Sequence, residues 1–296
     1  MSVLKFILYP IRTLIAQSNL LTNFFMSIQQ NCYNSLINKL IPDSSFYSLS
    51  EYTLVKTKNA TLKLSLGEYT SHEIAFNKTL SYNNAILKLL PQNEQFSILD
   101  IGAFVGEKSI LFAQKNLNNL VYSFEPNINI FNILNENISI NNLTNVLTLN
   151  IALGAEKTIA YSGCNVPNNI SGSIISKEKT NLKQVFNEVQ VDNLDNLLKE
   201  KTFKYPVKLI KIDIEGFEFE VLKGAVQLIT EFKPIIVTEI DDKFLKNNHS
   251  SALETLQFIA QFGYQFKHLE SNKSIDLNDE HLLIDCHWDV VAVPIV

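Results

Sequence analysis

FSILDIGAFVGEKSILFAQKN, residues 96–116, reads as a short apolar strand, a tight glycine turn and a helix. Strands and helices then alternate along most of the chain. Further strands are indicated at 119–126, 146–153, 207–216 and 233–240, and further helices at 127–141, 217–230 and 250–263. Because strands that alternate with helices form a parallel sheet covered on both faces, this pattern predicts an α/β fold.

The segments after the third strand extend this architecture. Residues 154–180 are polar and read as irregular, and residues 183–200 read as a strand followed by a helix. Gly263 is expected to end the last helix as its C-cap. Residues 264–270 and 287–295 then indicate two closing strands, arranged as a final antiparallel hairpin.

The chain before residue 96 divides at about residue 45. Residues 1–45 are predicted as an N-terminal helical extension, and residues 46–296 as the main domain. Within that domain, residues 52–66 alternate as an extended chain. TSHE at 70–73 is typical of a helix start, with Thr70 as its cap, and the helix is expected to run to Leu90.

The composition is that of an ordinary globular protein, 46% hydrophobic and 19% charged. A net charge of −5 and a single arginine, Arg12, argue against nucleic acid as a partner, because phosphate recognition needs a basic face. The cysteines are odd in number and far apart, at Cys32, Cys164 and Cys286. They indicate a reducing, cytoplasmic compartment, and neither they nor the histidines have the spacing of a metal site.

The first 28 residues, MSVLKFILYPIRTLIAQSNLLTNFFMSI, are apolar but interrupted. They lack the roughly 20 continuous apolar residues of a spanning helix, and no signal-peptide cleavage site follows. One helical stripe is apolar, and it comprises Leu4, Ile7, Ile11, Leu14, Leu21, Phe25 and Ile28. Two interpretations stay open: a helix packed on the domain or a second subunit, and peripheral contact with a membrane surface through residues 1–30.

Two features at the ends of the first two strands indicate a nucleoside site. Gly102 and Gly106 bracket the turn after the first strand, where backbone N–H groups can meet a polar ligand. Asp100 could hold an ammonium group or order the loop. Glu125 ends the second strand, 23 residues after Gly102, where a carboxylate can accept hydrogen bonds from two ribose hydroxyls. The alternatives are a purely structural glycine turn and an exposed acid before Pro126.

An adenosine site suits either a nicotinamide-dependent oxidoreductase or a methyltransferase. DIGAFVG, residues 100–106, lacks the G-x-G-x-x-G spacing that seats a pyrophosphate, and no arginine lies nearby for phosphate. The two closing strands also favour a methyltransferase. A non-catalytic cofactor-binding protein is a third possibility.

With these residues in view, the sequence resembles the FkbM family of S-adenosylmethionine-dependent methyltransferases. The matching segments, in order, are LDIGAFVG, FEPN, NNLTNVLTLNIALG, VDNLDNLL, LIKIDIEGFEFEVLKGA and PIIVTEI. The resemblance covers about residues 95–245 and leaves out the first 45. Two departures concern the cofactor contacts: VDNLD stands where the family more often has Thr-Leu-Asp, and Phe104 and Val105 replace an Asn and a small apolar residue.

The resemblance implies the class I methyltransferase fold. This is a Rossmann-like sheet of seven strands in the order 3-2-1-4-5-7-6, with one antiparallel strand. It implies S-adenosyl-L-methionine as the cofactor and residues 46–296 as the methyltransferase domain. The implied cofactor contacts are Asp100, Gly102, Ala103, Gly106, Glu125, Pro126, Asn127, Asn150, Ile151 and Ala152.

The acids of IKIDIEGFEFEVLKGA, residues 210–225, divide into two pairs. Asp213 and Glu215 are two apart, so on a strand they point to the same face and would line the site. Glu218 and Glu220 fall in the first turn of a helix, where negative charge favours the helix dipole.

Methyl transfer to a hydroxyl requires a base that takes the hydroxyl proton. Asp213, Glu215 and Glu239 are the candidate catalytic residues. A carboxylate pair that binds a divalent metal ranks second, because three clear ligands are not evident.

The acceptor is expected to lie against the segment GCNVPNNISGSII, residues 163–175. Its Ser171, Ser173 and asparagines could hydrogen-bond a polyhydroxylated molecule, although a solvated loop of turn-forming residues explains them equally well. From the resemblance, the predicted activity is O-methylation of a sugar or another small hydroxylated acceptor, as in glycan modification. The sequence leaves the oligomeric state open.

Overall fold

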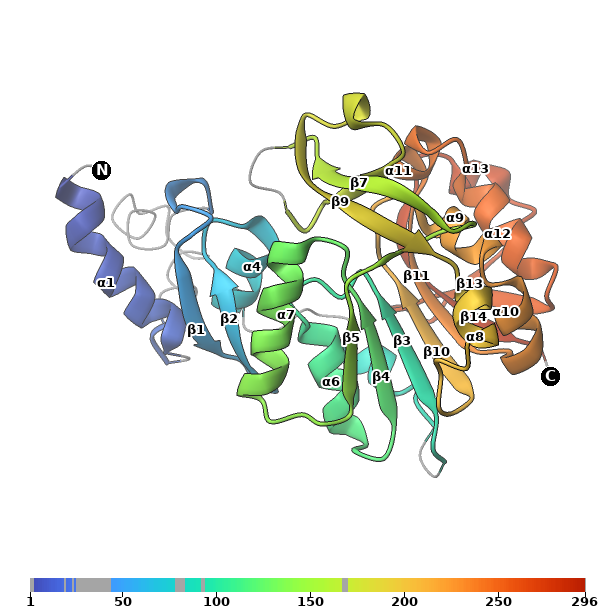
Figure 1. Cartoon of the computed structure of the whole chain (residues 1–296), viewed down its shortest axis with the longest axis horizontal. Coiled ribbons are helices and arrows are strands. Elements are labelled where there is room, and N and C mark those ends of the chain that lie inside the picture. The colour runs from blue at the N-terminus through green and yellow to red at the C-terminus, as the bar shows by residue number, and fades with distance from the viewer. Residues whose placement is uncertain are drawn as a thin grey trace.

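A computed structural model describes residues 3–18, 20–22, 24, 44–77, 83–91, 94–166 and 170–295 (Figure 1). Its centre is an eight-stranded sheet with the order β13-β12-β14-β11-β10-β3-β4-β5. The strands are β3 (Ser97–Ile101), β4 (Leu120–Phe124), β5 (Val146–Leu149), β10 (Val207–Ile212), β11 (Ile235–Asp241), β12 (Tyr264–His268), β13 (Ser274–Ile275) and β14 (His287–Pro294).

The strand order confirms the predicted topology. When the seven long strands are numbered along the chain, from β3 as the first to β14 as the last, their order is 3-2-1-4-5-7-6. The five strands from β5 to β11 are mutually parallel, and β14 runs antiparallel to both β11 and β12. Strands β12 and β14 are the predicted closing hairpin, and the short strand β13 at the edge was not predicted.

Helices cover both faces of this sheet, as predicted for parallel strands. They are α6 (Glu107–Lys115), α7 (Ile128–Ile140), α8 (Leu194–Lys199), α9 (Glu218–Lys223), α10 (Val226–Phe232), α11 (Asp242–Asn247), α12 (Ala252–Ala260) and α13 (Glu280–Leu283). The single helix predicted at 217–230 is wrong, because the chain breaks at Gly224. A Cβ there would lie 2.1 Å from the carbonyl oxygen of Gly154, so this close approach requires glycine. Gly263 has φ +75°, and its N–H donates to Ala260, as expected after the end of α12.

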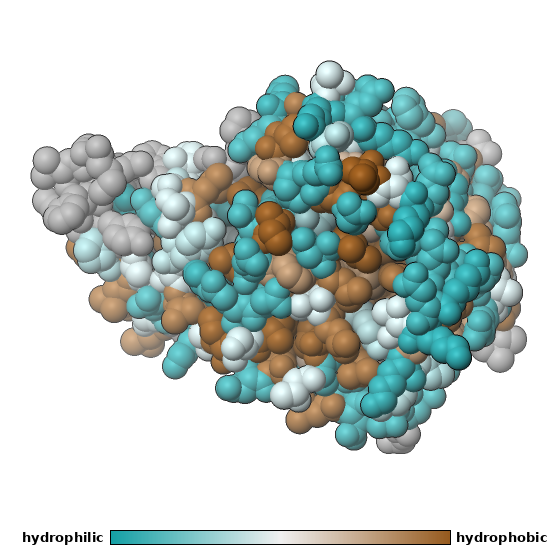
Figure 2. Space-filling view, in the orientation of Figure 1, coloured by the Kyte–Doolittle hydropathy of each residue, from teal (hydrophilic) through white to brown (hydrophobic). Residues whose placement is uncertain are grey.

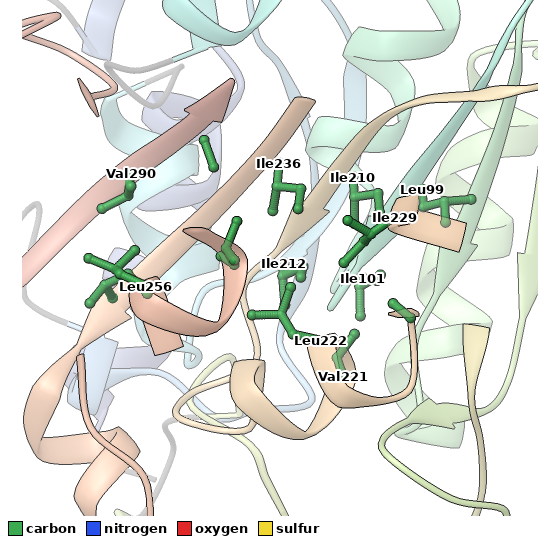
Figure 3. Close-up of a cluster of buried hydrophobic side chains, with 14 of the residues drawn as sticks. Leu99, Ile101, Ile210, Ile212, Val221, Leu222, Ile229, Ile236, Leu256 and Val290 are labelled. Carbon is green, nitrogen blue, oxygen red and sulfur yellow. The ribbon is translucent and has the colours of Figure 1, made fainter. Parts of the chain in front are cut away.

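The hydrophobic core lies in two layers, one on each face of the sheet. Figure 3 shows the first layer, in which β3, β10 and β11 pack against α9, α10 and α12. The side chains labelled in it include Ile101, Ile210, Ile212, Val221, Leu222, Ile229 and Leu256. On the other face Phe112 of α6 packs with Ile98 and Leu209. Strand β3 is buried along its whole length, which explains its unbroken apolar pattern.

A second, four-stranded sheet replaces the irregular segment predicted at 154–180. Its order is β6-β9-β7-β8, with β6 (Ala152–Leu153), β7 (Thr158–Cys164), β8 (Ile174–Ser176) and β9 (Gln184–Asp192), and a 3-10 turn, η2, at Lys179–Asn181. Strands β7 and β9 lie at the top of Figure 1. The inward residues Ala160 and Ser162 are small or polar, so β7 lacks the bulky alternation that identifies a strand in sequence.

The N-terminal part of the domain is a β-hairpin followed by short helices. These elements are η1 (Ser44–Phe46), β1 (Tyr52–Lys56), β2 (Thr61–Ser65), α4 (Tyr69–Asn77) and α5 (Asn83–Leu87). Helices α4 and α5 lie along the helix predicted from Thr70 to Leu90, but α5 ends at Leu87, and residues 78–82 lie outside the described residues. Thr70 as cap is also wrong, because the Glu68 carboxylate accepts from the backbone N–H groups of Thr70 (3.2 Å) and Ser71 (2.6 Å).

Helix α1 (Val3–Gln17) packs on the domain beside β1. Arg12, Ile15 and Ala16 are buried, and Gln17 Nε2 donates to Thr53 Oγ1 at 3.1 Å. Ile11 and Leu14 of the predicted apolar stripe are 43% and 57% exposed, whereas Leu21 of the same stripe packs against the buried cluster of β2 and α7. Figure 2 shows hydrophobic surface in the region that α1 and β1 occupy in Figure 1. Phe25 and Ile28 of the stripe lie outside the described residues, and within the described part no helix is long and apolar enough to cross a membrane.

One buried side chain joins the hairpin to the rest of the domain. Asn137 of α7 is fully buried, and its Oδ1 accepts from the backbone N–H of Lys63 at 2.6 Å. Its Nδ2 donates to the carbonyl oxygens of Val105 (2.8 Å) and Lys63 (3.3 Å). This amide therefore links β2, α7 and the turn before α6.

We expect Asn137→Ala to lower the free energy of unfolding by about 2–4 kcal/mol, because it leaves buried backbone groups of Lys63 and Val105 without hydrogen-bond partners. Urea denaturation followed by circular dichroism measures this loss. The matched control is Asn118→Ala at an exposed position, which should change the free energy of unfolding by less than about 0.5 kcal/mol. Equal effects of the two substitutions would contradict the assigned role of Asn137.

Candidate active site

The turn between β3 and α6 has the tight geometry that its glycines predict. Gly102 and Gly106 have φ +75° and +89°, and Phe104 between them has φ 50°. A Cβ on Gly102 would lie 2.0 Å from the carbonyl oxygen of Asp213, so only glycine fits. The backbone N–H groups of Gly102 and Ala103 both donate to Phe124 of the neighbouring strand, at 3.1 and 2.9 Å. The turn is thus held against the carboxyl ends of β4 and β10.

A buried lysine that the sequence analysis did not single out lies directly under this turn. Lys211 Nζ donates to the carbonyl oxygen of Gly102 at 2.9 Å and lies 3.4 Å from both Asp100 Oδ1 and Asp213 Oδ2. Burial alone would lower the pKa of Lys211, but the charges of Asp213 and Asp100 outweigh it and raise that pKa. Asp100 is fully buried and also accepts from Ser109 Oγ at 2.5 Å, so it orders the turn from below.

Glu125 is buried beside the turn. Its Oε2 accepts from the N–H of Phe104 at 3.0 Å, and its Oε1 from the N–H of Asn127 at 2.8 Å. Burial raises its pKa to about 7 against the opposing effect of these two hydrogen bonds. Asn150 Nδ2 donates to the backbone oxygens of Glu125 (2.8 Å) and Pro126 (3.1 Å), and Asn127 caps α7. Glu125, Asn127 and Asn150 therefore brace this edge of the sheet.

Two hollows meet at Gly102, which lines both. On one side is an apolar pocket of about 20 Å³ between Phe124, Pro126, Ile151 and Ala152, closed by Ile175 and Phe217. Four of the predicted cofactor residues come together there: Gly102, Pro126, Ile151 and Ala152.

On the other side of Gly102 is a cavity of about 260 Å³, which we call the acidic cavity. The turn residues 102–105 form one wall, and Lys108 and Lys211 contribute positive charge. Its acids are Glu107 and all three predicted catalytic residues, Asp213, Glu215 and Glu239. The sequence thus identified carboxylates that converge on one cavity. Predicted contacts Asp100, Gly106, Glu125, Asn127 and Asn150 are not among the residues lining either hollow.

Glu215 reaches the acidic cavity in a different way from the one predicted. Strand β10 ends at Ile212, so Asp213 and Glu215 do not share a strand face. Glu215 has φ 56° and Gly216 φ 95°, and a Cβ on Gly216 would lie 2.4 Å from the carbonyl oxygen of Phe244. The left-handed turn, and not strand alternation, directs Glu215 toward the cavity.

Glu218 lies in the first turn of α9, as predicted. It is buried, and its Oε1 accepts from the backbone N–H of Ile214 at 3.1 Å, which closes the turn before the helix. Glu220 pairs with Lys223 one turn along the helix. Neither residue lines the acidic cavity.

The acidic side chains that line the cavity repel one another, and this repulsion adds to the effect of burial on the pKa values of two of them. Burial, then the charge of Asp213, raises the pKa of Glu215 to about 8. Burial, then the charges of Asp213 and Glu215, raises the pKa of Glu239 to about 10. His287, one of the histidines whose spacing did not indicate a metal site, places its Nε2 2.7 Å from Glu239 Oε1 and its Nδ1 3.4 Å from Asp241 Oδ2. His287 is largely exposed, so it connects the carboxyl group of Glu239 with solvent.

The mouth of the acidic cavity joins two distant segments. Ser171 Oγ donates to Glu68 Oε1 at 2.9 Å, and Thr70 Oγ1 donates to Ser171 Oγ at 2.7 Å. Thr70 and Ser171 both line the cavity, whereas Ser173 hydrogen-bonds Ile170 and does not. Within the described part of the chain, no group of three or more His, Cys, Asp or Glu side chains is placed to hold a metal ion.

A family comparison identifies the chain. The model of the methyltransferase FkbM domain matches residues 100–266, more than half of the 296 residues. The chain therefore belongs to the FkbM family of methyltransferases, whose cofactor is S-adenosylmethionine.

Individual relatives are more distant. Methyltransferase 1 of Beauveria bassiana (strain ARSEF 2860) is 28% identical over 144 residues, which are 43% of this chain and 57% of that protein. The solved FkbM methyltransferase of Methylobacillus flagellatus KT has a TM-score of 0.47 and 16% identity, over 93% of this chain and 60% of that one. M. jannaschii TYW2, solved in complex with AdoMet, has a TM-score of 0.40 and 17% identity, over 83% and 86%. The chain thus spans less than two thirds of the length of the first two relatives.

The raised pKa of Glu239 predicts a pH-dependent stability. Between the ordinary value of 4.5 and about 10, the folded protein keeps a proton that the unfolded chain releases, so stability falls as pH rises. Glu239→Gln removes that ionisation. We expect the variant to gain stability over the native protein from pH 5 to pH 9, by up to about 1.4 kcal/mol per pH unit.

Urea denaturation at each pH measures this difference. Glu231→Gln, at an exposed position of α10, is the control and should follow the native curve. Native and Glu239→Gln curves that stay parallel across this range would show that Glu239 does not keep its proton on folding.

Proposed function

We propose that the protein transfers a methyl group from S-adenosylmethionine to a hydroxyl of a sugar or another small hydroxylated acceptor. The observation that carries this proposal is the junction at Gly102 of an apolar pocket with an acidic cavity. S-adenosylmethionine has the same two-part character, with a flat adenine at one end and a cationic sulfur and amino group at the other. An anionic ligand would gain nothing from the acids around Asp213.

The residues present fit this cofactor. The adenine would lie between Pro126, Ile151 and Ala152. Because the apolar pocket now has room for about one water molecule, Ile175 and Phe217 would have to move apart when it enters. Each oxygen of Glu125 accepts one backbone N–H and keeps a lone pair. Because Glu125 lines neither hollow, the turn at Phe104 would have to move for a ribose hydroxyl to reach it.

The methionine end would lie in the acidic cavity, against the turn residues 102–105. When bound, the cofactor supplies an electrophilic methyl group on a positively charged sulfur. A positive charge in this cavity lowers the pKa values of Glu215 and Glu239 and so favours their ionised forms. The cavity's acids therefore become competent bases only when a cation is present.

We assign the base to Glu239. An acceptor hydroxyl must lose its proton as its oxygen forms the new bond to carbon. Glu239 lines the cavity and can pass a proton to His287 at 2.7 Å, which reaches solvent. Asp213 is held by Lys211 and Glu215 by its turn, so these two serve to orient and to balance charge. Hydroxyl groups of Thr70 and Ser171 at the mouth support a polar, hydroxylated acceptor.

The nicotinamide-dependent alternative is disfavoured on electrostatic grounds. A dinucleotide would bring its pyrophosphate toward the turn after β3, where Asp213, Glu215 and Glu239 line the adjoining cavity. Its negative charge would raise the pKa values of Glu215 and Glu239 further, whereas a cationic ligand lowers them.

The proposed activity predicts that the purified protein binds S-adenosylhomocysteine in calorimetry and does not bind NADH. With the cofactor and a metabolite or glycan extract, mass spectrometry should detect products heavier by one methylene group. We expect Glu239→Gln to lose at least about 100-fold in turnover, because the proton acceptor is removed, while affinity for S-adenosylhomocysteine stays nearly unchanged.

The exposed Glu231→Gln variant should keep full turnover. Binding of NADH in place of S-adenosylhomocysteine would favour the oxidoreductase. Cofactor binding with no methylated product, together with an unchanged biological output of Glu239→Gln, would favour a non-catalytic binding protein.

The extension, residues 1–45, stays a predicted unit separate from residues 46–296, and we propose that it contacts a membrane surface peripherally. Support comes from the outward side of the α1 region, where Ile11 and Leu14 are exposed together with Leu20 and Phe24. The buried side, at Ile15 and Ala16, already packs on the domain.

This membrane proposal predicts that the full chain sediments with phosphatidylcholine vesicles and that the double variant Ile11→Asp, Leu14→Asp does not, because it removes apolar area from the interface. Leu117→Asp, an equally exposed apolar position next to α6, is the control and should sediment like the native protein. A native protein that stays entirely in the supernatant would contradict membrane contact.

A further inference from the structure

One basic side chain of the acidic cavity has no role in the function proposed above. Among the described residues that line the cavity, the basic ones are Lys108 and Lys211. Lys211 donates to the carbonyl oxygen of Gly102 at 2.9 Å. It also lies 3.4 Å from both Asp100 and Asp213, so each of its three N–H donors has a partner. A ligand that needs a cation in this cavity therefore depends on Lys108.

Lys108 faces the acids of the cavity from helix α6. Phe112 of α6 packs on the sheet in the same buried cluster as Val237 of β11. Lys108 precedes Phe112 by four residues, so it lies on the same side of the helix, one turn nearer to its start. Glu239 follows Val237 by two residues on β11, so its side chain points to the same face of the sheet, toward α6. The cavity therefore lies between acids at the strand ends and a helix wall that carries Lys108.

Lys108 is a buried cation. Its Nζ lies 2.7 Å from Glu107 Oε2, and the two side chains are only 7% and 10% exposed. Burial lowers the pKa of Lys108 by more than the charge of Glu107 raises it. The charges of the protein thus do not compensate fully for burial, and an anion of a ligand beside Nζ would stabilise the ammonium.

The methionine end of S-adenosylmethionine carries two opposite charges, an ammonium and a carboxylate on the same carbon atom. The ammonium is attracted by acids such as Asp213 and Glu215, which line the cavity. The carboxylate must enter the same cavity, because one carbon atom ties it to the ammonium. There the acids would repel it unless a cation faces it. Lys108 provides that cation on the wall opposite the strand ends.

We propose that Lys108 binds the carboxylate of the cofactor's methionine end and so determines which way round that end lies in the acidic cavity. The three N–H donors of an ammonium allow Nζ to hold Glu107 and this carboxylate together. The inference rests on the proposed function, because it needs the methionine end in this cavity. It adds Lys108 to the cofactor contacts that the family resemblance implies.

Two ligands that differ only in the carboxylate test the proposal. They are S-adenosylhomocysteine and its decarboxylated form, S-adenosyl-3-thiopropylamine, and calorimetry on the full chain gives the ratio of their dissociation constants. We expect the native protein to bind S-adenosylhomocysteine at least about tenfold more tightly, because its carboxylate gains a charge-assisted hydrogen bond. Lys108→Met should abolish this preference, and binding of the decarboxylated ligand should be retained or strengthened. Retained binding also shows that the variant is folded.

The matched control is Lys115→Met, an exposed lysine in the last turn of the same helix. It removes one positive charge from α6 away from the cavity, so the ratio of the two dissociation constants should stay at the native value. A similar loss of preference in both variants would contradict a direct contact between Lys108 and the carboxylate.

Three further results would overturn the proposal. They are a native protein without preference between the two ligands, a preference that survives in Lys108→Met, and an equal loss of affinity for both ligands in that variant, which would indicate a purely structural role. In each of these cases the native protein still binds the cofactor product, so the proposed function stands. A native protein that binds neither ligand would contradict both the proposed function and the role of Lys108.

Discussion

The site depends on one buried cation. Strands β3 and β10 lie at the centre of the sheet, and each carries an acid, Asp100 and Asp213, to the point where the strand ends. Lys211 lies between them and also holds the carbonyl oxygen of Gly102. Removing one partner of a buried ion pair typically costs 3–5 kcal/mol, because the remaining charge is left without compensation. The central strand pair, the glycine turn and the floor of the acidic cavity are therefore stabilised together or lost together.

Apart from Lys211, the acidic cavity is lined by more acidic than basic side chains, and this imbalance favours a cationic ligand. Without one, burial and mutual repulsion keep Glu215 and Glu239 near the protonated form at neutral pH. The arrangement costs stability in the empty protein, as electrostatic strain at functional sites commonly does. Binding and proton release are thereby coupled, so the pH at which the cavity is filled also determines which carboxyl groups can act as bases.

Sequence periodicity was sufficient for the α/β class and the glycine turn, because apolar runs of strand length and glycine spacing are local signals, whereas the strand order came from the resemblance to the FkbM family. The positions at the ends of the predicted strands identified three of the cavity's acids, Asp213, Glu215 and Glu239, but not Glu107. The sequence did not reveal the role of Lys211. A lysine between two isoleucines, as in IKI, is also typical of an edge strand, and its two acidic neighbours are recognised only in the folded structure. The second sheet was not predicted because β7 buries small residues. The geometry of Glu215 was not predicted because a left-handed turn leaves no periodic pattern in the sequence. His287 and Glu239 are 48 residues apart in the sequence, and only the pairing of β14 with β11 brings them into contact.

The hydrogen bonds that join Glu68 and Thr70 to Ser171 connect positions about 100 residues apart at the mouth of the cavity. Glu68 and Thr70 precede the portion shared with the FkbM family, residues 100–266, and strand β14 follows it. The cavity is therefore built from two parts of the chain. Ser171 and the acids Asp213, Glu215 and Glu239 lie within the matched region, whereas Glu68 and Thr70 lie before it, so a fragment limited to the matched residues would lack one side of the mouth.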